Sequence, residues 1–265
     1  MRVTVLGCGT SGGVPRIAGS GDASSENAGA PGGYWGDCDP NEPRNRRRRA
    51  SILVETAETS ILVDTSPDLR AQCLENGIRR LDAVLYTHDH ADHSHGIDDL
   101  RAYAATQRQR IPVHGTAATL ARLKRRFGYV FDAVPNYPSI CEGREIDLAP
   151  FRLGDLEVVP FEQQHGPATT LGFRFGSVAY STDLNELDDT AFRILDGVDT
   201  WIVDALRYKP HATHAHLART LSWIERVRPR RAYLTHMTWE MDYRTLLAEL
   251  PPGVEPAYDG LVIEG

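Results

Sequence analysis

The feature that most constrains this chain is a dense run of potential metal ligands, Thr87-His88-Asp89-His90-Ala91-Asp92-His93. It follows the apolar stretch 83–86, which predicts a buried strand. A loop at a strand end lets closely spaced side chains converge on one point, whereas a regular strand or helix does not. Imidazole and carboxylate are ligands of Zn²⁺ and similar first-row ions. The run therefore predicts a metal site, in preference to a merely solvated polar loop.

Three other segments place a potential ligand just after an apolar strand. His165 follows the stretch 156–161, Asp183 follows 177–181, and His236 follows 231–235. Taken alone, a residue of this kind is more often a structural or surface residue than a metal ligand. Their shared placement predicts that four segments present ligands from one edge of a sandwich of sheets.

Length and periodicity indicate an α/β protein with one large core. The chain has 265 residues, of which 41% are hydrophobic, and short apolar strands alternate with helical patterns in both halves. Strands are expected near 2–6, 50–56, 60–63, 83–86, 111–114, 156–161, 171–175, 177–181, 200–203, 231–235 and 262, and helices near 67–76, 97–106, 116–127, 187–195, 216–227 and 243–249. We expect a single domain over residues 1–265.

The N-terminal region contains two further patterns. Gly7, Gly9 and Gly12 have the spacing of a dinucleotide-binding loop, but no helix pattern follows them, so we reject that interpretation. The segment 17–36 is rich in Gly, Ala and Ser, and we expect a flexible insertion there. The basic run 44–49 is compatible either with a solvated charge run or with a positive rim beside an anion site.

Several segments resemble a known family over nearly the whole chain. They are GCGTSGGVP at the start, RRRRAS, ILVDTSPD, THDHADH, STD, and LTH near the end. The chain resembles the metallo-β-lactamase superfamily, and within it the phosphoribosyl cyclic phosphodiesterases of the carbon–phosphorus lyase pathway. The resemblance implies an αββα sandwich and metal-dependent hydrolysis of small phosphodiesters, such as ribose or nucleoside cyclic phosphates.

The resemblance also implies a role for individual residues. It implies one metal ion on His88, His90 and His165, a second on Asp92, His93 and His236, and Asp183 as the bridge between two divalent ions, zinc or manganese. Asp92 and His214 are the candidate catalytic residues, with His214 beside the leaving group. Asp64 and Asp204 would support ligands through hydrogen bonds. Two cations outweigh the carboxylates of Asp92 and Asp183, so the site favours a small anionic substrate.

One departure from the family concerns a third metal. Relatives hold a structural zinc on a cysteine cluster and a late histidine, whereas this chain has a lone Cys38 and carries Trp239 at the histidine position. We therefore expect no structural zinc.

Composition limits the compartment and the partners. Four scattered cysteines and the lack of a signal-peptide pattern favour the cytoplasm, with no membrane partner. The net charge of −7 argues against nucleic acid as a partner, and a homodimer is compatible with the sequence. Two alternatives stay open: a ribonuclease Z-like nuclease that processes RNA 3′ ends, and a non-catalytic sensor of metal or nucleotide with the same fold.

Overall fold

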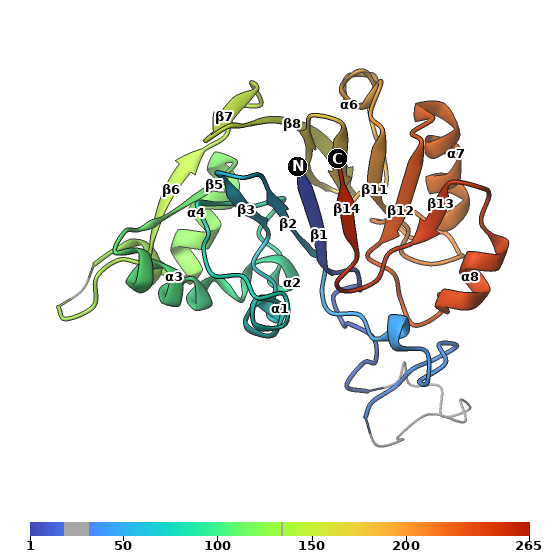
Figure 1. Cartoon of the computed structure of the whole chain (residues 1–265), viewed down its shortest axis with the longest axis horizontal. Coiled ribbons are helices and arrows are strands. Elements are labelled where there is room, and N and C mark those ends of the chain that lie inside the picture. Colours follow the sequence, from blue (N-terminus) through green and yellow to red (C-terminus); the bar gives the residue numbers. More distant parts are fainter. Residues whose placement is uncertain (19–31, 134) are drawn as a thin grey trace.

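The apolar strands assemble into two mixed sheets that lie face to face (Figure 1). The structure is a computed structural model that describes residues 1–18, 32–133 and 135–265. The first sheet has the order β14 (Val262–Glu264), β1 (Arg2–Gly7), β2 (Ser51–Glu55), β3 (Ser60–Val63), β4 (Ala83–Leu85), β5 (Ile111–Gly115) and β6 (Cys141–Glu145). The second has the order β13 (Val254–Pro256), β12 (Arg231–Thr235), β11 (Thr200–Asp204), β10 (Val178–Ser181), β9 (Ala168–Phe175), β8 (Leu156–His165) and β7 (Phe151–Leu153).

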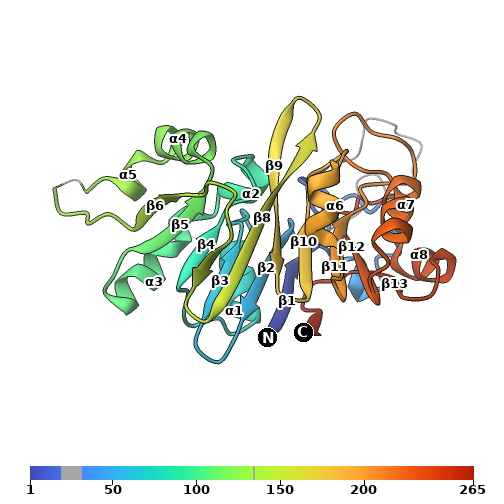
Figure 2. The ribbon, with the colours of Figure 1, turned by 90° about the horizontal axis from the view of Figure 1, so that it is seen from above.

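Helices cover the outer side of each sheet, as Figure 2 shows from above. The first sheet is covered by α1 (Leu69–Glu75), α2 (Ala91–Ser94), η2 (Ile97–Asp99), α3 (Leu100–Gln107), α4 (Ala117–Arg126) and α5 (Gly128–Phe131). The second is covered by α6 (Asp189–Leu195), α7 (Leu217–Val227) and α8 (Tyr243–Glu249), and the short helix η1 (Pro43–Asn45) lies in the N-terminal loop. The α/β class and the αββα sandwich expected from the sequence are confirmed. Among the helices of the described ranges, none has the length and apolar character needed to cross a membrane.

The strands of the first sheet are apolar on both faces because each face is buried. In β2, Ile52 and Val54 belong to the core between the two sheets, whereas Leu53 belongs to the core beneath the helices. The same alternation occurs in β3, where Ile61 and Val63 face inward and Leu62 faces the helices. A strand that is buried on both faces reads as a continuous apolar run, which is why these strands were predictable.

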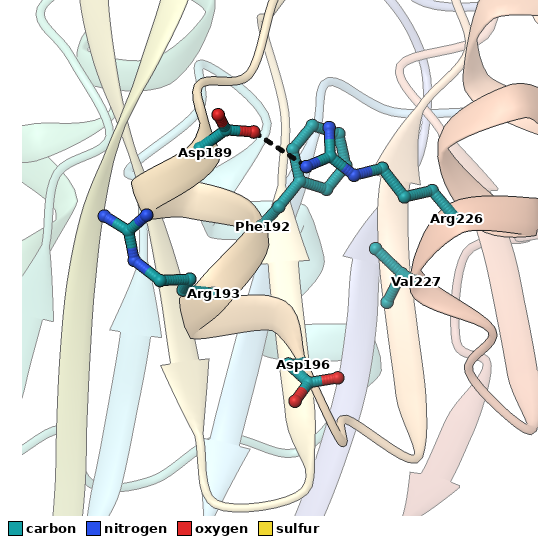
Figure 3. Close-up of a pocket in the computed structure, with 6 residues that line it drawn as sticks. All are labelled: Asp189, Phe192, Arg193, Asp196, Arg226 and Val227. Carbon is teal, nitrogen blue, oxygen red and sulfur yellow. Dashed lines mark hydrogen bonds and ion pairs between the residues drawn. The ribbon is translucent and has the colours of Figure 1, made fainter.

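On the outer side of the second sheet, α6 and α7 are joined by one aromatic and one ionic contact (Figure 3). The guanidinium of Arg226 lies over the ring of Phe192, 3.6 Å from its centroid. The same guanidinium pairs with the Asp189 carboxylate at 2.7 Å. In the surface pocket between α6 and α7 that Figure 3 shows, the charge of Arg226 is therefore balanced by Asp189.

Some predicted elements differ from those observed. β8 and β9 are longer than expected and run together as a ribbon up to His165, so His165 is the last residue of its strand and does not follow it. The loop expected at 91–94 is instead the single helical turn α2, which holds Asp92 and His93. β6, β7 and β13 escaped prediction because they are short and partly polar.

The expected flexible insertion 17–36 is only partly described, because 19–31 lie outside the described residues. At its C-terminal end the prediction was wrong. Tyr34 and Trp35 are buried, and Trp35 packs in a small cluster with Val14, Cys38 and Trp239. Two aromatic rings therefore anchor a segment for which the sequence suggested no anchor.

The basic run 44–49 is neither a solvated charge run nor a free positive rim, because protein groups engage its side chains. Arg44 pairs with Glu42, Arg48 with Glu75, and Arg49 with Asp68, while Arg46 lies over the ring of Trp35. Arg47 is buried and donates to the carbonyl oxygens of Thr238 at 3.0 Å and Met241 at 2.5 Å. The run therefore ties the N-terminal loop to the segment that follows β12.

Candidate metal centre

The predicted ligands lie where parallel strands of both sheets end. β3 runs parallel to β4, and β10, β11 and β12 are parallel to one another, so their carboxyl ends meet at one edge of the sandwich. Asp64, Asp183 and His236 each come just after such a strand and have left-handed backbone, with φ of 64°, 55° and 59°. This conformation is rare for residues other than glycine, and here it turns the chain sharply out of the strand.

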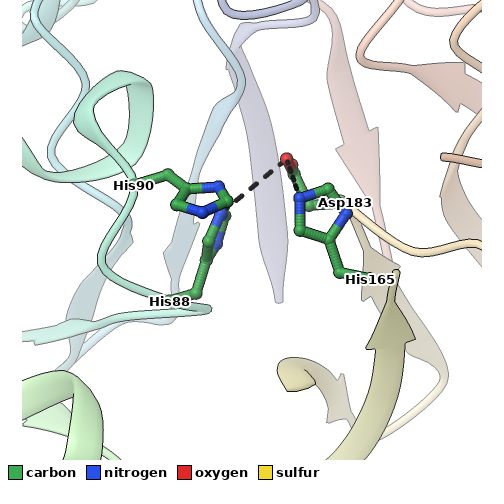
Figure 4. Close-up of side chains that lie close together, drawn as sticks. All are labelled: His88, His90, His165 and Asp183. Carbon is green, nitrogen blue, oxygen red and sulfur yellow. Dashed lines mark ion pairs between the residues drawn. The ribbon is translucent and has the colours of Figure 1, made fainter. Parts of the chain in front are cut away.

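The first group of ligands consists of His88, His90, His165 and Asp183, whose potential ligand atoms lie within 4.8 Å of one another. Figure 4 shows these side chains pointing toward one another, His88 and His90 from one loop and His165 and Asp183 from two other segments. Oδ1 of Asp183 is 3.8 Å from Nε2 of His88 and 3.9 Å from Nε2 of His165. Three imidazoles and one carboxylate oxygen therefore face a common point.

The second group consists of Asp92, His93, His236 and again Asp183. Oδ2 of Asp183 is 2.9 Å from Nε2 of His93 and 3.4 Å from Nε2 of His236. Oδ2 of Asp92 is 3.4 Å and 3.5 Å from the same two nitrogens. Asp183 thus presents one carboxylate oxygen to each group, as a bridging ligand would.

Burial and charge show that these residues fit divalent cations. The Nε2 atoms of His88, His93 and His236 are buried and have no hydrogen-bond partner among the residues that the structure describes. Such orphaned polar atoms are rare inside proteins. Their convergence with carboxylate oxygens matches the ligand chemistry of zinc and its first-row neighbours.

The pKa values of the cluster show that its carboxylates favour positive charge on neighbouring groups. Burial alone raises the pKa of the Asp183 carboxyl, but His236 and His93 outweigh burial and hold it well below its ordinary value. Burial lowers the pKa of His236, yet Asp183 and Asp92 outweigh it and raise that pKa to about 9. The carboxylates therefore stabilise positive charge between them, as a cation site requires.

Hydrogen bonds behind the ligands fix their orientation. Asp64 is fully buried and lies 2.8 Å from Nδ1 of His93, while Thr87 donates its backbone N–H and its hydroxyl to the two Asp64 oxygens at 2.8 Å each. Nδ1 of His165 lies 2.7 Å from the carbonyl oxygen of Thr213. With Nδ1 engaged in this way, Nε2 of each ring is left to face the centre.

His214 stands beside the two groups. Its Nδ1 is 2.9 Å from Oδ2 of the buried Asp204, and its Nε2 is 3.9 Å from Oδ1 of Asp183. Its ring stacks on His236 with centroids 4.7 Å apart. Asp204, His214 and His236 form a third group of potential ligands, which shares His236 with the second. The structure thus brings together every site residue that the sequence indicated.

A hollow of about 210 Å³ opens beside His214 and contains two arginines that the sequence did not indicate. Its wall includes Arg16, Arg207, His211, Trp239 and Glu240. Arg16 lies over the Trp239 ring, and Arg207 donates to the carbonyl oxygens of Lys209 and Pro210. Within the described ranges, neither guanidinium forms an ion pair with a carboxylate. Isolated arginines in separate loops give no motif, so no sequence signal could have found them.

The Cys38 position is apolar apart from one cation. Cys38 is buried with Val14, Trp35 and Trp239, and its sulfur lies 4.0 Å from a guanidinium nitrogen of Arg47. Burial raises the pKa of this thiol to about 11, which disfavours the thiolate that a zinc ligand needs. The expected lack of a third zinc stays a prediction.

Comparison with known families agrees with this geometry. Residues 59–237 match the family model of the β-lactamase superfamily domain. The chain belongs to the metallo-β-lactamase superfamily. A new diphosphatase from the PhnP family has a similar structure, with a TM-score of 0.87 and 34% identity, and the match covers 100% of this chain and 97% of that one. The structure of human tRNase Z, short form, has a TM-score of 0.65 at 17% identity and covers 100% and 99% of the two chains, which shows the shared fold alone.

Two curated relatives differ in name. An octanoyltransferase of Porphyromonas gingivalis is 33% identical over 98% of this chain and 51% of its own length. A ribonuclease Z of Bradyrhizobium diazoefficiens is 30% identical over 52% of this chain and 47% of its own length. The chain thus spans about half the length of the curated relatives that it matches.

Proposed function

We propose that this protein is a metal-dependent hydrolase that cleaves small phosphodiesters, with ribose or nucleoside cyclic phosphates as the preferred class. In this proposal His88, His90, His165 and Asp183 hold one divalent cation, and Asp92, His93, His236 and Asp183 hold the other, zinc or manganese. The observation that carries the proposal is the division of the two Asp183 oxygens between two groups of histidines. Two cations so held would supply an activated water and would neutralise charge on a phosphoryl group.

The proposed role of His214 is to protonate the leaving oxygen. Asp204 lies 2.9 Å from Nδ1 of His214, so this carboxylate fixes the orientation of the ring. Nε2 then faces the centre and can donate a proton to a departing alkoxide. In this arrangement His214 would be the acid, and the buried Asp204 would act only by holding His214 in position.

The preference for an anion has two sources. The positive charge of the two cations proposed for the centre exceeds the negative charge of Asp92 and Asp183. The adjoining hollow adds the guanidiniums of Arg16 and Arg207, which outnumber the one carboxylate in its wall, Glu240. A neutral ester or lactam gains little from this field, whereas a phosphodiester gains from both parts of it.

Diphosphates are a second candidate substrate class, because a structural neighbour of high similarity is called a diphosphatase. A disubstituted diphosphate is also an anion with bridging P–O bonds, so the same centre and the same acid could serve it. Acyl transfer, the activity in the name of the Porphyromonas relative, finds no comparable support in these side chains.

The experiment is a substrate panel with the metal-loaded protein. It compares ribose cyclic phosphates, linear alkyl and aryl diesters, disubstituted diphosphates, a thioester and a tRNA precursor. We expect cyclic phosphates to give the highest kcat/KM, followed by other small diesters, with no cleavage of the tRNA precursor. Asp183→Asn should abolish turnover and lower the content of bound metal, whereas Asp189→Asn, at a surface position outside the centre, should change neither.

Each other result has a clear meaning. Preference for diphosphates would establish the second candidate, and preference for the tRNA precursor would establish a ribonuclease Z-like activity. Full metal content without turnover of any substrate would indicate a sensor of the same fold. Rapid thioester hydrolysis would refute the phosphodiesterase proposal.

A further inference from the structure

Asp89 lies in the middle of the ligand run but belongs to neither ligand group. It is buried, with only 4% of its surface exposed. Its Oδ1 accepts from Nη1 of Arg122 at 2.9 Å and its Oδ2 accepts from Nη2 of Arg126 at 2.5 Å. Arg126 also donates to the Asp89 backbone carbonyl. The segment that carries His88 and His90 is therefore bound to α4 by three charge-assisted hydrogen bonds.

The helix that holds Asp89 is itself well anchored. Arg122 and Arg126 are four residues apart, so they lie on one face of α4 and reach the same carboxylate. Leu120 and Leu123 are buried against the first sheet, and Thr116 caps the helix by accepting from the N–H of Thr119. Asp89 is thus tied to a rigid element rather than to another loop.

The two halves of the ligand run are held in different ways, although Thr87 links them: its hydroxyl donates to Asp64 and lies 2.9 Å from Nδ1 of His88. His93 is held by Asp64 at Nδ1, and its backbone carbonyl accepts from the N–H of Thr65 at 2.8 Å. His90 has no such support, since its ring forms no hydrogen bond among the residues that the structure describes. The direction of the His90 ring consequently depends on the backbone of residues 88–90, which Asp89 fixes.

We infer that the Asp89–Arg122–Arg126 clamp positions His88 and His90, and that it sets the metal affinity of the first ligand group without affecting the second. The inference rests on the metal assignment in the proposed function and is independent of which substrate is cleaved. Supporting residues of this kind change metal affinity because they hold ligands in productive orientations. Asp89 is a positioning residue and does not touch the centre.

The test measures metal affinity in two single-site backgrounds, by competition with a chromogenic chelator. His236→Ala leaves only the first group, and His165→Ala leaves only the second with its ligands intact. Asp89→Asn and Arg126→Met are placed in each background. Arg125→Gln is the control, because Arg125 is an exposed neighbour on the same helix that takes no part in the clamp.

We expect both clamp variants to weaken metal binding about 10- to 100-fold in the His236→Ala background and less than twofold in the His165→Ala background. The double variant Asp89→Asn with Arg126→Met should lose less affinity than the product of the two single losses, because both variants disrupt the Asp89–Arg126 pair. Equal losses in both backgrounds, accompanied by a lower melting temperature of the metal-free protein, would show a general structural role and overturn the inference. Unchanged affinity in the His236→Ala background would also overturn it. If neither background bound metal before Asp89 was changed, the metal assignment itself would be wrong.

Discussion

Replacement of Asp64 by asparagine should weaken one metal site more than the other while leaving the fold intact. The Asp64 carboxylate accepts hydrogen bonds from the Thr87 N–H and the Thr87 hydroxyl, and it holds Nδ1 of His93, all at 2.8 Å. Asparagine has a single acceptor oxygen, which the fixed backbone N–H of Thr87 will claim. Its amide nitrogen then faces His93 and donates to Nδ1.

This exchange reverses the protonation of the His93 ring. With Nδ1 accepting, the proton resides on Nε2, the atom that faces Asp183 and Asp92. A cation can bind there only if the proton returns to Nδ1, where it meets the amide N–H of the new side chain. Removing such a support typically costs about 10- to 100-fold in metal affinity. This loss equals about 1.4–2.8 kcal/mol.

The fold should tolerate the change, because burial raises the pKa of Asp64 and a neutral amide avoids burying a charge. Competition with a chromogenic chelator should show one strongly weakened equivalent of metal and one weakened less, because Asp64 reaches His88 only through the Thr87 hydroxyl. The melting temperature of the metal-free protein should stay near that of the wild type. Asp82→Asn, which changes an aspartate paired with Arg80, serves as the control. Wild-type affinity for both equivalents in a folded Asp64→Asn protein would refute the reasoning.

Three other predictions follow from the site and from the N-terminal loop. His214→Ala should slow alkyl diesters about 10²- to 10⁴-fold more than activated aryl diesters, measured as kcat, and equal slowing would exclude the acid role. Glu42 is buried, and hydrogen bonds from Arg44, with a smaller share from Arg244, lower its pKa to about 2. Its ionised form therefore stabilises the fold above pH 4.5, and this stabilisation is lost as the pH falls toward 2. In denaturant unfolding Glu42→Gln should therefore lose about 1–2 kcal/mol at pH 6 and almost nothing near pH 2, and a gap independent of pH would contradict the ion pair. Metal at a hundred times its Kd should raise Tm by about 5–10 °C, reversibly on chelation, and no shift would argue against binding to the folded state.

The sequence indicated His88, Asp183 and His236 as candidate metal ligands because each comes shortly after an apolar strand. A strand buried on both faces is visible as an uninterrupted run such as Ser60–Val63, and the residue after it is placed by the strand. Parallel neighbours then bring these residues to one edge, so His88, Asp183 and His236 could be predicted as neighbours although about 50 to 150 residues separate them.

Other features depend on contacts that leave no local pattern. β6 reads Cys-Glu-Gly-Arg-Glu and forms a strand only because β5 offers it an edge. The basic run was ambiguous for the same reason, since its partners Glu75 and Asp68 lie in a later helix and its N-terminal turn. Tertiary packing likewise places Arg16 and Arg207 in the wall of one hollow and brings Arg122 and Arg126 to Asp89. Periodicity and composition do not encode such contacts.

The left-handed backbone at Asp64, Asp183 and His236 has a consequence for how this protein can evolve. Each of these conformations costs about 1–3 kcal/mol for a residue other than glycine. Glycine at any of the three positions would relieve that strain and would at the same time delete a ligand or its support. Selection for thermal robustness alone would therefore favour such replacements, and only selection for the chemistry opposes them. Copies of this chain freed from their catalytic role should drift toward glycine first at these three turns, and their metal-free form should become harder to unfold than the metal-free form of this chain.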